Sequence, residues 1–216
     1  MIDRLVVGFD LDLTLVDSRL GVAATYRAMS ERTGVYIDAD EAAGRLGPPL
    51  HVELANWFPP DEVDDAGDLY RALYPSTAID PTPAMPGVSA SLSAVRSRGG
   101  SIVVITGKYE PNAWLHVRRL GLDVDDVVGW AWAEGKTDAM LDFGVRVYVG
   151  DHPADMVAAR EAGALAVGVL TGSHSTQELV EAGADEVLAD LVSFPACLDA
   201  YLGSGEISVG LGQPDR

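Results

Sequence analysis

Two aspartates one residue apart, Asp10 and Asp12, are the residues of this chain best placed to do chemistry. They follow the apolar run 5–9, which predicts a buried strand. Two carboxylates at the end of a buried strand are costly unless their charge is compensated, and a divalent cation with oxygen ligands would compensate it. One aspartate could then act as nucleophile and the other as proton donor. The alternative is that they only cap a helix or form a turn.

Four more apolar runs predict further parallel strands of the same sheet. Helical periodicity separates most of them, and strands that alternate with helices favour an α/β fold with a doubly wound, Rossmann-like parallel sheet. In such a sheet, ligands bind outside the carboxyl ends of the strands. The four runs are residues 102–105, 127–128, 145–149 and 165–170.

The residues that follow the predicted strands are hydroxyls, glycines, a lysine and carboxylates, so we expect them to converge with Asp10 on one edge of the sheet. For Asp151 the alternative is an ordinary N-cap of the next helix, and for Lys108 it is a solvated loop charge. The residues at these ends are Thr106, Gly107, Lys108, Asp151, Asp155, Thr171 and Gly172.

The long gap between the first two strands predicts an inserted subdomain. The first strand ends at residue 9 and the second begins at 102, although a crossover helix needs only about a dozen residues. Helical patterns fill the gap, and 75–86 is expected to be a semi-stiff return linker. We therefore expect a helical cap over Asp10. The predicted division is an α/β core of residues 1–17 and 84–216, with a mobile tail at 203–216, and a cap of residues 18–83.

The string Asp-x-Asp-x-Thr-Leu-Val-Asp-Ser from residue 10 resembles the first motif of the haloacid dehalogenase-like hydrolases, most closely the branch with phosphoglycolate phosphatase. Thr106 resembles the second-motif hydroxyl, and Lys136 resembles the third-motif lysine. Gly-Asp-x-x-x-Asp, which places Asp151 and Asp155, resembles the fourth, acidic motif. The resemblance covers nearly the whole chain and is vaguest in the cap.

The resemblance implies a Mg²⁺-dependent phosphatase that hydrolyses small phosphate monoesters through an aspartyl-phosphate. Asp10 would be the nucleophile and Asp12 the general acid and base. The metal would be held by Asp10, the backbone carbonyl of Asp12, Asp151 and, through water, Asp155. The phosphate would be held by Thr106, Lys136, Lys108 and backbone amides near Leu11 and Gly107, the last of which stands where related phosphatases often have asparagine.

Three alternative functions are considered. A phosphomutase of the same superfamily shares every core residue. A non-catalytic phosphate-binding module could use the same fold. A haloacid dehalogenase is disfavoured, because it needs neither Mg²⁺ nor the second acid that Asp12 provides.

In the predicted cap, Arg45 and His51 flank a Gly-Pro-Pro loop at residues 47–49. This loop could face the site and contact the leaving group of the substrate. The alternative is a solvated loop between two helices.

Composition limits the partners of the chain. The 33 acidic and 15 basic residues give a formal charge of −18, which disfavours nucleic acid and anionic membranes. The single cysteine, Cys197, excludes an internal disulfide. No signal segment or membrane span is visible. We therefore expect a cytoplasmic monomer or homodimer that acts on a small phosphorylated metabolite.

Overall fold

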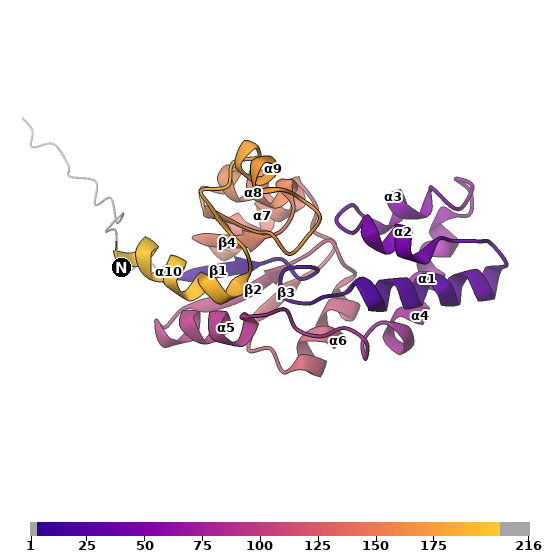
Figure 1. Ribbon diagram of the computed structural model, residues 1–216, viewed down its shortest axis with the longest axis horizontal. Coiled ribbons are helices and arrows are strands. Elements are labelled where there is room, and N and C mark those ends of the chain that lie inside the picture. The colour runs from indigo at the N-terminus through magenta and orange to yellow at the C-terminus, as the bar shows by residue number, and fades with distance from the viewer. Residues whose placement is uncertain (1–3, 204–216) are drawn as a thin grey trace, which may run out of the picture.

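The computed structural model describes residues 4–203, and its centre is a six-stranded parallel sheet. The strand order is β3-β2-β1-β4-β5-β6, which confirms the predicted α/β, doubly wound fold (Figure 1). The expected mobile tail lies outside the described residues, except for Gly203, which ends the last helix. The strands are β1 (Val6–Phe9), β2 (Ser101–Ile105), β3 (Asp126–Val128), β4 (Val147–Gly150), β5 (Leu165–Val169) and β6 (Glu186–Leu188).

Alternate side chains of the central strands are buried against opposite layers of helices. On β2, Ile102 and Val104 pack into one hydrophobic cluster, and Val103 and Ile105 pack into another. The first layer consists of α5 (Val88–Ser97), α6 (Glu110–Leu120) and α10 (Phe194–Gly203). The second consists of α7 (Glu134–Phe143), α8 (Pro153–Glu161) and α9 (Thr176–Glu181). Burial on both faces explains why these strands are continuous apolar runs.

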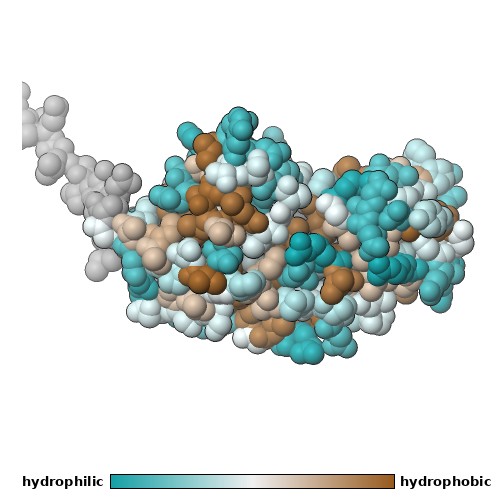
Figure 2. All heavy atoms as spheres, viewed as in Figure 1, coloured by the Kyte–Doolittle hydropathy of each residue, from teal (hydrophilic) through white to brown (hydrophobic). Residues whose placement is uncertain are grey.

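The helices between β1 and β2 pack on one another around a hydrophobic cluster of their own. Met29, Leu54 and Tyr74 are fully buried in it. Figure 1 shows these helices beside the sheet, beyond the carboxyl end of β1. On the face drawn in Figure 2, hydrophilic side chains cover much of their outer surface. The helices are α1 (Arg19–Thr33), α2 (Ala39–Gly44), α3 (Leu50–Leu54) and α4 (Val63–Thr77).

The two segments that join these helices to the sheet are hydrogen-bonded to each other. The amide of Asp17 donates to the carbonyl of Pro83 at 3.0 Å, and the amide of Met85 donates to that of Leu15 at 2.9 Å. Val16 and Ala84 form an antiparallel bridge between these bonds. Both connections therefore leave the core at one place.

Two elements differ from the sequence prediction. β6 was not predicted, because its three residues include only two apolar ones beside a glutamate. The return linker expected from residue 75 starts later, because α4 continues through Pro75 to Thr77. A capping box formed by Ser175 and Glu178 starts α9.

Candidate active site

Three buried carboxylates meet at the carboxyl ends of β1 and β4. These strands are neighbours, and the amide of Asp10 donates to the carbonyl of Val149 at 2.8 Å, which aligns the loops that follow. Asp10, Asp151 and Asp155 each offer an oxygen, and the three oxygens lie within 4.8 Å of one another. The spacing and the all-oxygen donors suit a divalent cation with hard ligands.

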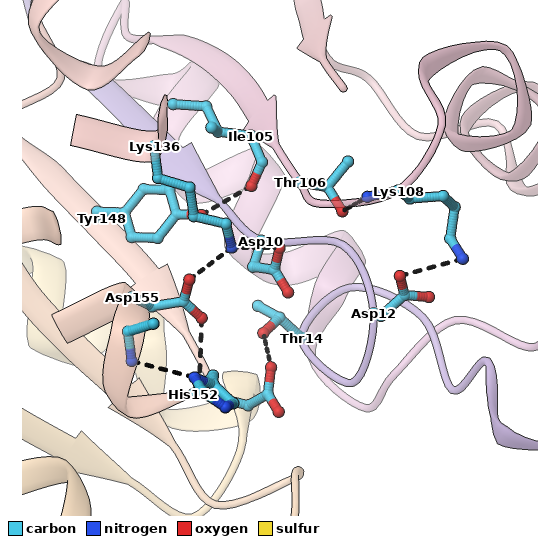
Figure 3. A network of polar contacts seen from close by, with 12 residues as sticks. Asp10, Asp12, Thr14, Ile105, Thr106, Lys108, Lys136, Tyr148, His152 and Asp155 are labelled. Atoms are coloured by element: carbon cyan, nitrogen blue, oxygen red, sulfur yellow. Dashed lines mark hydrogen bonds and ion pairs between the residues drawn. The ribbon is translucent and has the colours of Figure 1, made fainter. Parts of the chain in front are cut away.

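Lys136, near the start of α7, inserts its ammonium group between two of these carboxylates (Figure 3). Its Nζ lies 2.8 Å from an oxygen of Asp10 and 2.5 Å from one of Asp155. Burial lowers the pKa of Lys136, but the carboxylates of Asp10 and Asp155 raise it by more, so it stands well above its usual value. Lys136 is therefore a permanent cation in direct contact with the predicted nucleophile.

One ammonium does not compensate three carboxylates. Burial raises the pKa of Asp10 to about 7, although Lys136 opposes the shift and Asp155 adds to it. Burial also raises the pKa of Asp151 well above its usual value, and the charges of Asp10 and Asp155 raise it further. Because these raised pKa values show that the ionised carboxylates are unfavourable here, a further positive charge at the site would stabilise them. These residues fit a divalent cation.

The loop after Asp10 is held by two hydroxyls, that of Thr171, which was expected at this edge of the sheet, and that of Thr14, which was not singled out from the sequence. The hydroxyl of Thr14 donates to Asp151 at 3.2 Å, and that of Thr171 donates to the carbonyl of Leu13. Leu13 has a left-handed φ of 58°, an unfavourable conformation for a branched residue that these contacts help to maintain. The side chain of Leu11 is fully buried in the core, so only its backbone can face a ligand.

Two glycines bring the strand-end loops close to the carboxylates. A Cβ on Gly150 would lie 2.3 Å from an oxygen of Asp155, and one on Gly172 would lie 2.0 Å from an oxygen of Asp151. Neither position can carry a side chain while the carboxylates stay in place. By contrast, a Cβ on Gly107 would make only ordinary contacts at 3.7 Å.

Asp12 points away from the carboxylate cluster and pairs with Lys108 at 3.1 Å (Figure 3). Burial raises the pKa of Asp12, but Lys108 and other partners outweigh it, and the net shift is downward. Lys108 is therefore not a solvated loop charge. The hydroxyl of Thr106 accepts the amide of Lys108 at 3.2 Å, which fixes the loop after β2.

Lys108 has a second partner, which comes from the inserted helices. Lys108 donates to the hydroxyl of Tyr74 at 2.8 Å, and that hydroxyl also lies 2.9 Å from Nε2 of His116 on α6. Tyr74 and His116 are both fully buried. Burial lowers the pKa of His116 to about 4, and Lys108 contributes to the shift, so the imidazole is neutral. The sequence analysis did not assign Tyr74 to the site.

A cavity of about 560 Å³ lies between the sheet edge and the inserted helices. Its sheet side includes Thr106 and Gly107 together with the aspartates and lysines described above, and its other side includes Arg45 and His51. Arg45 is held by Glu53, which accepts from its guanidinium at 2.9 and 2.7 Å, and it also pairs with Glu41.

The structure thus gathers the predicted site residues in three groups around one cavity. Asp10, Asp151 and Asp155 form the carboxylate cluster, and Lys136 contacts two of its members. Asp12 and Lys108 form a separate ion pair, and Arg45 and His51 lie on the opposite wall. Within residues 4–203, no helix has the length and apolar character needed to cross a membrane.

Comparison with known proteins adds the family. Residues 7–169 match the family model described as haloacid dehalogenase-like hydrolase. The chain is 30% identical over 210 residues to a phosphoglycolate phosphatase of Rhodospirillum rubrum, with 86% of this chain and 87% of that protein covered. It is 29% identical over 139 residues to tyrosine-protein kinase PtkA of Mycobacterium tuberculosis, covering 63% of this chain and only 48% of that protein.

Among solved structures, a haloacid dehalogenase-like family hydrolase from Streptococcus pneumoniae superposes with a TM-score of 0.77. The match covers 94% of this chain and 100% of that chain at 23% identity, and it therefore shows the common fold. The chain belongs to the haloacid dehalogenase-like hydrolase family.

Proposed function

We propose that the chain is a phosphatase that hydrolyses small phosphate monoesters with the help of Mg²⁺. The observation that carries this proposal is the ion pair between Lys136 and Asp10 within a cluster of three buried carboxylates. A nucleophilic carboxylate and an anionic phosphoryl group repel each other, so attack on phosphorus requires positive charge nearby. The phosphatases among its relatives support the same activity.

Asp10 would attack phosphorus and form an aspartyl-phosphate, and its bond to Lys136 orients it for attack. Bound Mg²⁺ would lower the repulsion between that carboxylate and the phosphoryl oxygens. Asp10, Asp151 and the backbone carbonyl of Asp12 would hold the metal, with Asp155 acting through water. Thr106 and the amides near Leu11 and Gly107 would bind the remaining oxygens.

Asp12 would protonate the leaving oxygen and later take the proton of the water that cleaves the intermediate. Its contact with Lys108 stabilises the ionised form, which is the form needed for the second step. Lys108 would also lie within reach of a phosphoryl group bound near Thr106. Residues 18–83 would act as a cap that excludes water and bulky esters from the cavity.

The test is phosphate release from a panel of esters, with and without Mg²⁺. We expect small phosphate esters to release inorganic phosphate rapidly and a folded phosphoprotein to release it slowly. Rapid turnover of the phosphoprotein would contradict the proposed cap. Conversion of a sugar phosphate into its isomer, without release of phosphate, would identify a mutase instead. Phosphate binding without turnover of any ester would indicate a binding module.

A further inference from the structure

The wall of the cavity formed by the inserted helices is mainly apolar. A ligand held by the sheet edge through its phosphate would direct the rest of the molecule at this wall, because the wall lies opposite the carboxylate cluster. Burial of apolar ligand surface there would be favourable. The apolar and aromatic residues of this wall include Val22, Tyr26, Leu50, Leu54, Val63 and Tyr70.

The charges on the same wall compensate one another. Two arginines, Arg45 and Arg71, line it together with two carboxylates, Glu53 and Asp64. Within the described residues, neither arginine has an uncompensated charge, because Arg45 makes a two-pronged pair with Glu53 and Arg71 pairs with Asp68 at 2.6 Å. The wall therefore provides little attraction for an anionic group.

Glu53 is the group that neutralises Arg45 most closely. It is 8% exposed, and it also accepts a hydrogen bond from the indole of Trp57 at 2.8 Å. The guanidinium of Arg45 in turn lies over the ring of Trp57, 5.6 Å from its centre. Arg45 is thus held by Glu53, Trp57 and Glu41, and a ligand carboxylate would have to compete with a preformed, partly buried ion pair.

The size of the cavity also favours a large, uncharged leaving group. Its volume of about 560 Å³ is in the range of sites that take ligands much larger than a phosphorylated two-carbon acid. Trp130, over which the guanidinium of Arg71 lies at 5.2 Å, adds an aromatic surface beside the cavity. An uncharged aromatic group could fill this space and contact apolar side chains throughout.

We infer that the preferred substrate is a phosphate monoester whose leaving group is uncharged and apolar or aromatic, and that the Arg45–Glu53 pair disfavours leaving groups that carry a carboxylate. This inference rests on the proposed phosphatase activity and specifies its substrate class. His51 lies on the same wall but is exposed, so it does not provide a buried cation. The formal charge of −18 further disfavours a substrate with an added carboxylate.

The first test compares benzyl phosphate with phosphoglycolate on the wild-type protein in the presence of Mg²⁺. Both are alkyl esters with leaving alcohols of similar basicity, so the comparison isolates recognition of the leaving group. We expect kcat/KM to be at least about tenfold higher for benzyl phosphate, because its ring is buried against the apolar wall. An equal or higher value for phosphoglycolate would overturn the inference and leave the phosphatase intact.

The second test removes the charge of Glu53 and keeps its shape. In Glu53→Gln, Arg45 loses its buried counter-ion and keeps only the exposed Glu41, so kcat/KM for phosphoglycolate should rise by about tenfold and that for benzyl phosphate should change little. Glu62→Gln, at the exposed start of α4, removes the same charge and should change neither value. A Glu53→Gln protein that melts like wild type and shows no gain on phosphoglycolate would refute the role of Glu53.

The two tests separate the possible failures. Hydrolysis of neither ester, nor of an activated aryl phosphate, would overturn the proposed phosphatase itself. Hydrolysis with a preference for phosphoglycolate would overturn only the substrate class. Because the first test uses the unaltered protein, its result does not depend on the folding of a variant.

Discussion

The hydroxyl of Tyr74 on α4 lies 2.9 Å from Nε2 of His116 on α6, so an inserted helix is hydrogen-bonded to a helix that packs on the sheet. The same hydroxyl accepts from Lys108, which pairs with Asp12. A single phenol therefore links the inserted helices to the ion pair of the proposed general acid.

Replacement of Tyr74 by phenylalanine tests this link. Tyr74→Phe keeps the buried ring and removes the hydroxyl, which leaves His116 without its partner and Lys108 less constrained. We expect the free energy of unfolding to fall by about 1–3 kcal/mol, the usual cost of a buried unpaired polar group. Urea titration measures it, and Tyr36→Phe, at a position 77% exposed, is the control. Equal stability of the two variants would contradict the link.

Removal of the metal should abolish activity on an aryl phosphate, and Mg²⁺ should restore it. Asp151→Asn should weaken metal binding more than it alters the fold, since the amide keeps the size of the side chain but loses its charge. Calorimetric titration with Mg²⁺ and circular dichroism give the two readouts. Full activity in excess chelator would exclude a metal-dependent mechanism.

Substitution of Asp10 and of Asp12 should impair different steps of the reaction. Asp10→Asn should form no phosphoenzyme, because it lacks the nucleophile. Asp12→Asn should slow alkyl phosphates by about 10²–10⁴-fold, the usual contribution of a general acid, and slow activated aryl phosphates less. Rapid quenching with radiolabelled ester detects the phosphoenzyme. Label on the Asp10 variant, or wild-type turnover of alkyl esters by the Asp12 variant, would show that the roles are wrongly assigned.

The raised pKa of Asp10 predicts a pH dependence of stability in the metal-free protein. Burial raises this pKa from 3.8 to about 7, so between these values the folded state holds a proton that the unfolded state has released. The contribution of Asp10 to stability therefore falls as pH rises from about 4 to 7, by at most about 1.4 kcal/mol per pH unit. Urea unfolding in chelator, compared with Asp10→Asn, isolates the effect. A pH dependence unchanged in the variant would contradict it.

Arg45→Ala and His51→Ala should change the preference among esters without abolishing the chemistry, because both residues line the cavity opposite the carboxylate cluster. Arg45→Ala also leaves Glu53 without its cation, so it should disfavour anionic leaving groups further. Relative kcat/KM values across the ester panel measure this. If both variants match wild type on every ester, the loop at residues 47–49 does not contact the substrate.

The sequence was sufficient to predict the order of strands and helices in the core, because the strands are buried on both faces and appear as unbroken apolar runs. It was not sufficient for β6, whose three residues depend on pairing with β5 rather than on their own composition. Pro75 likewise predicts the end of a helix, but α4 continues past it because tertiary packing buries the adjacent Tyr74.

The site shows the same division. Asp10 and Asp151 could be named from the sequence, because strand ends in a parallel sheet converge. Tyr74 could not, because its helical periodicity is explained by the core and nothing in its spacing places its hydroxyl beside His116, 42 residues away. The pairing of Arg45 with Glu53 was also hidden, since it depends on how α2 and α3 meet.

The antiparallel bridge between Val16 and Ala84 has a consequence for how new proteins could be built on this core. Because both ends of the inserted segment leave from one hydrogen-bonded pair, a short hairpin turn can span them. The inserted helices therefore form a module that is joined to the core at a single point. A different helical module can be joined at the same two positions, provided that it supplies partners for Lys108 and His116 in place of the Tyr74 hydroxyl.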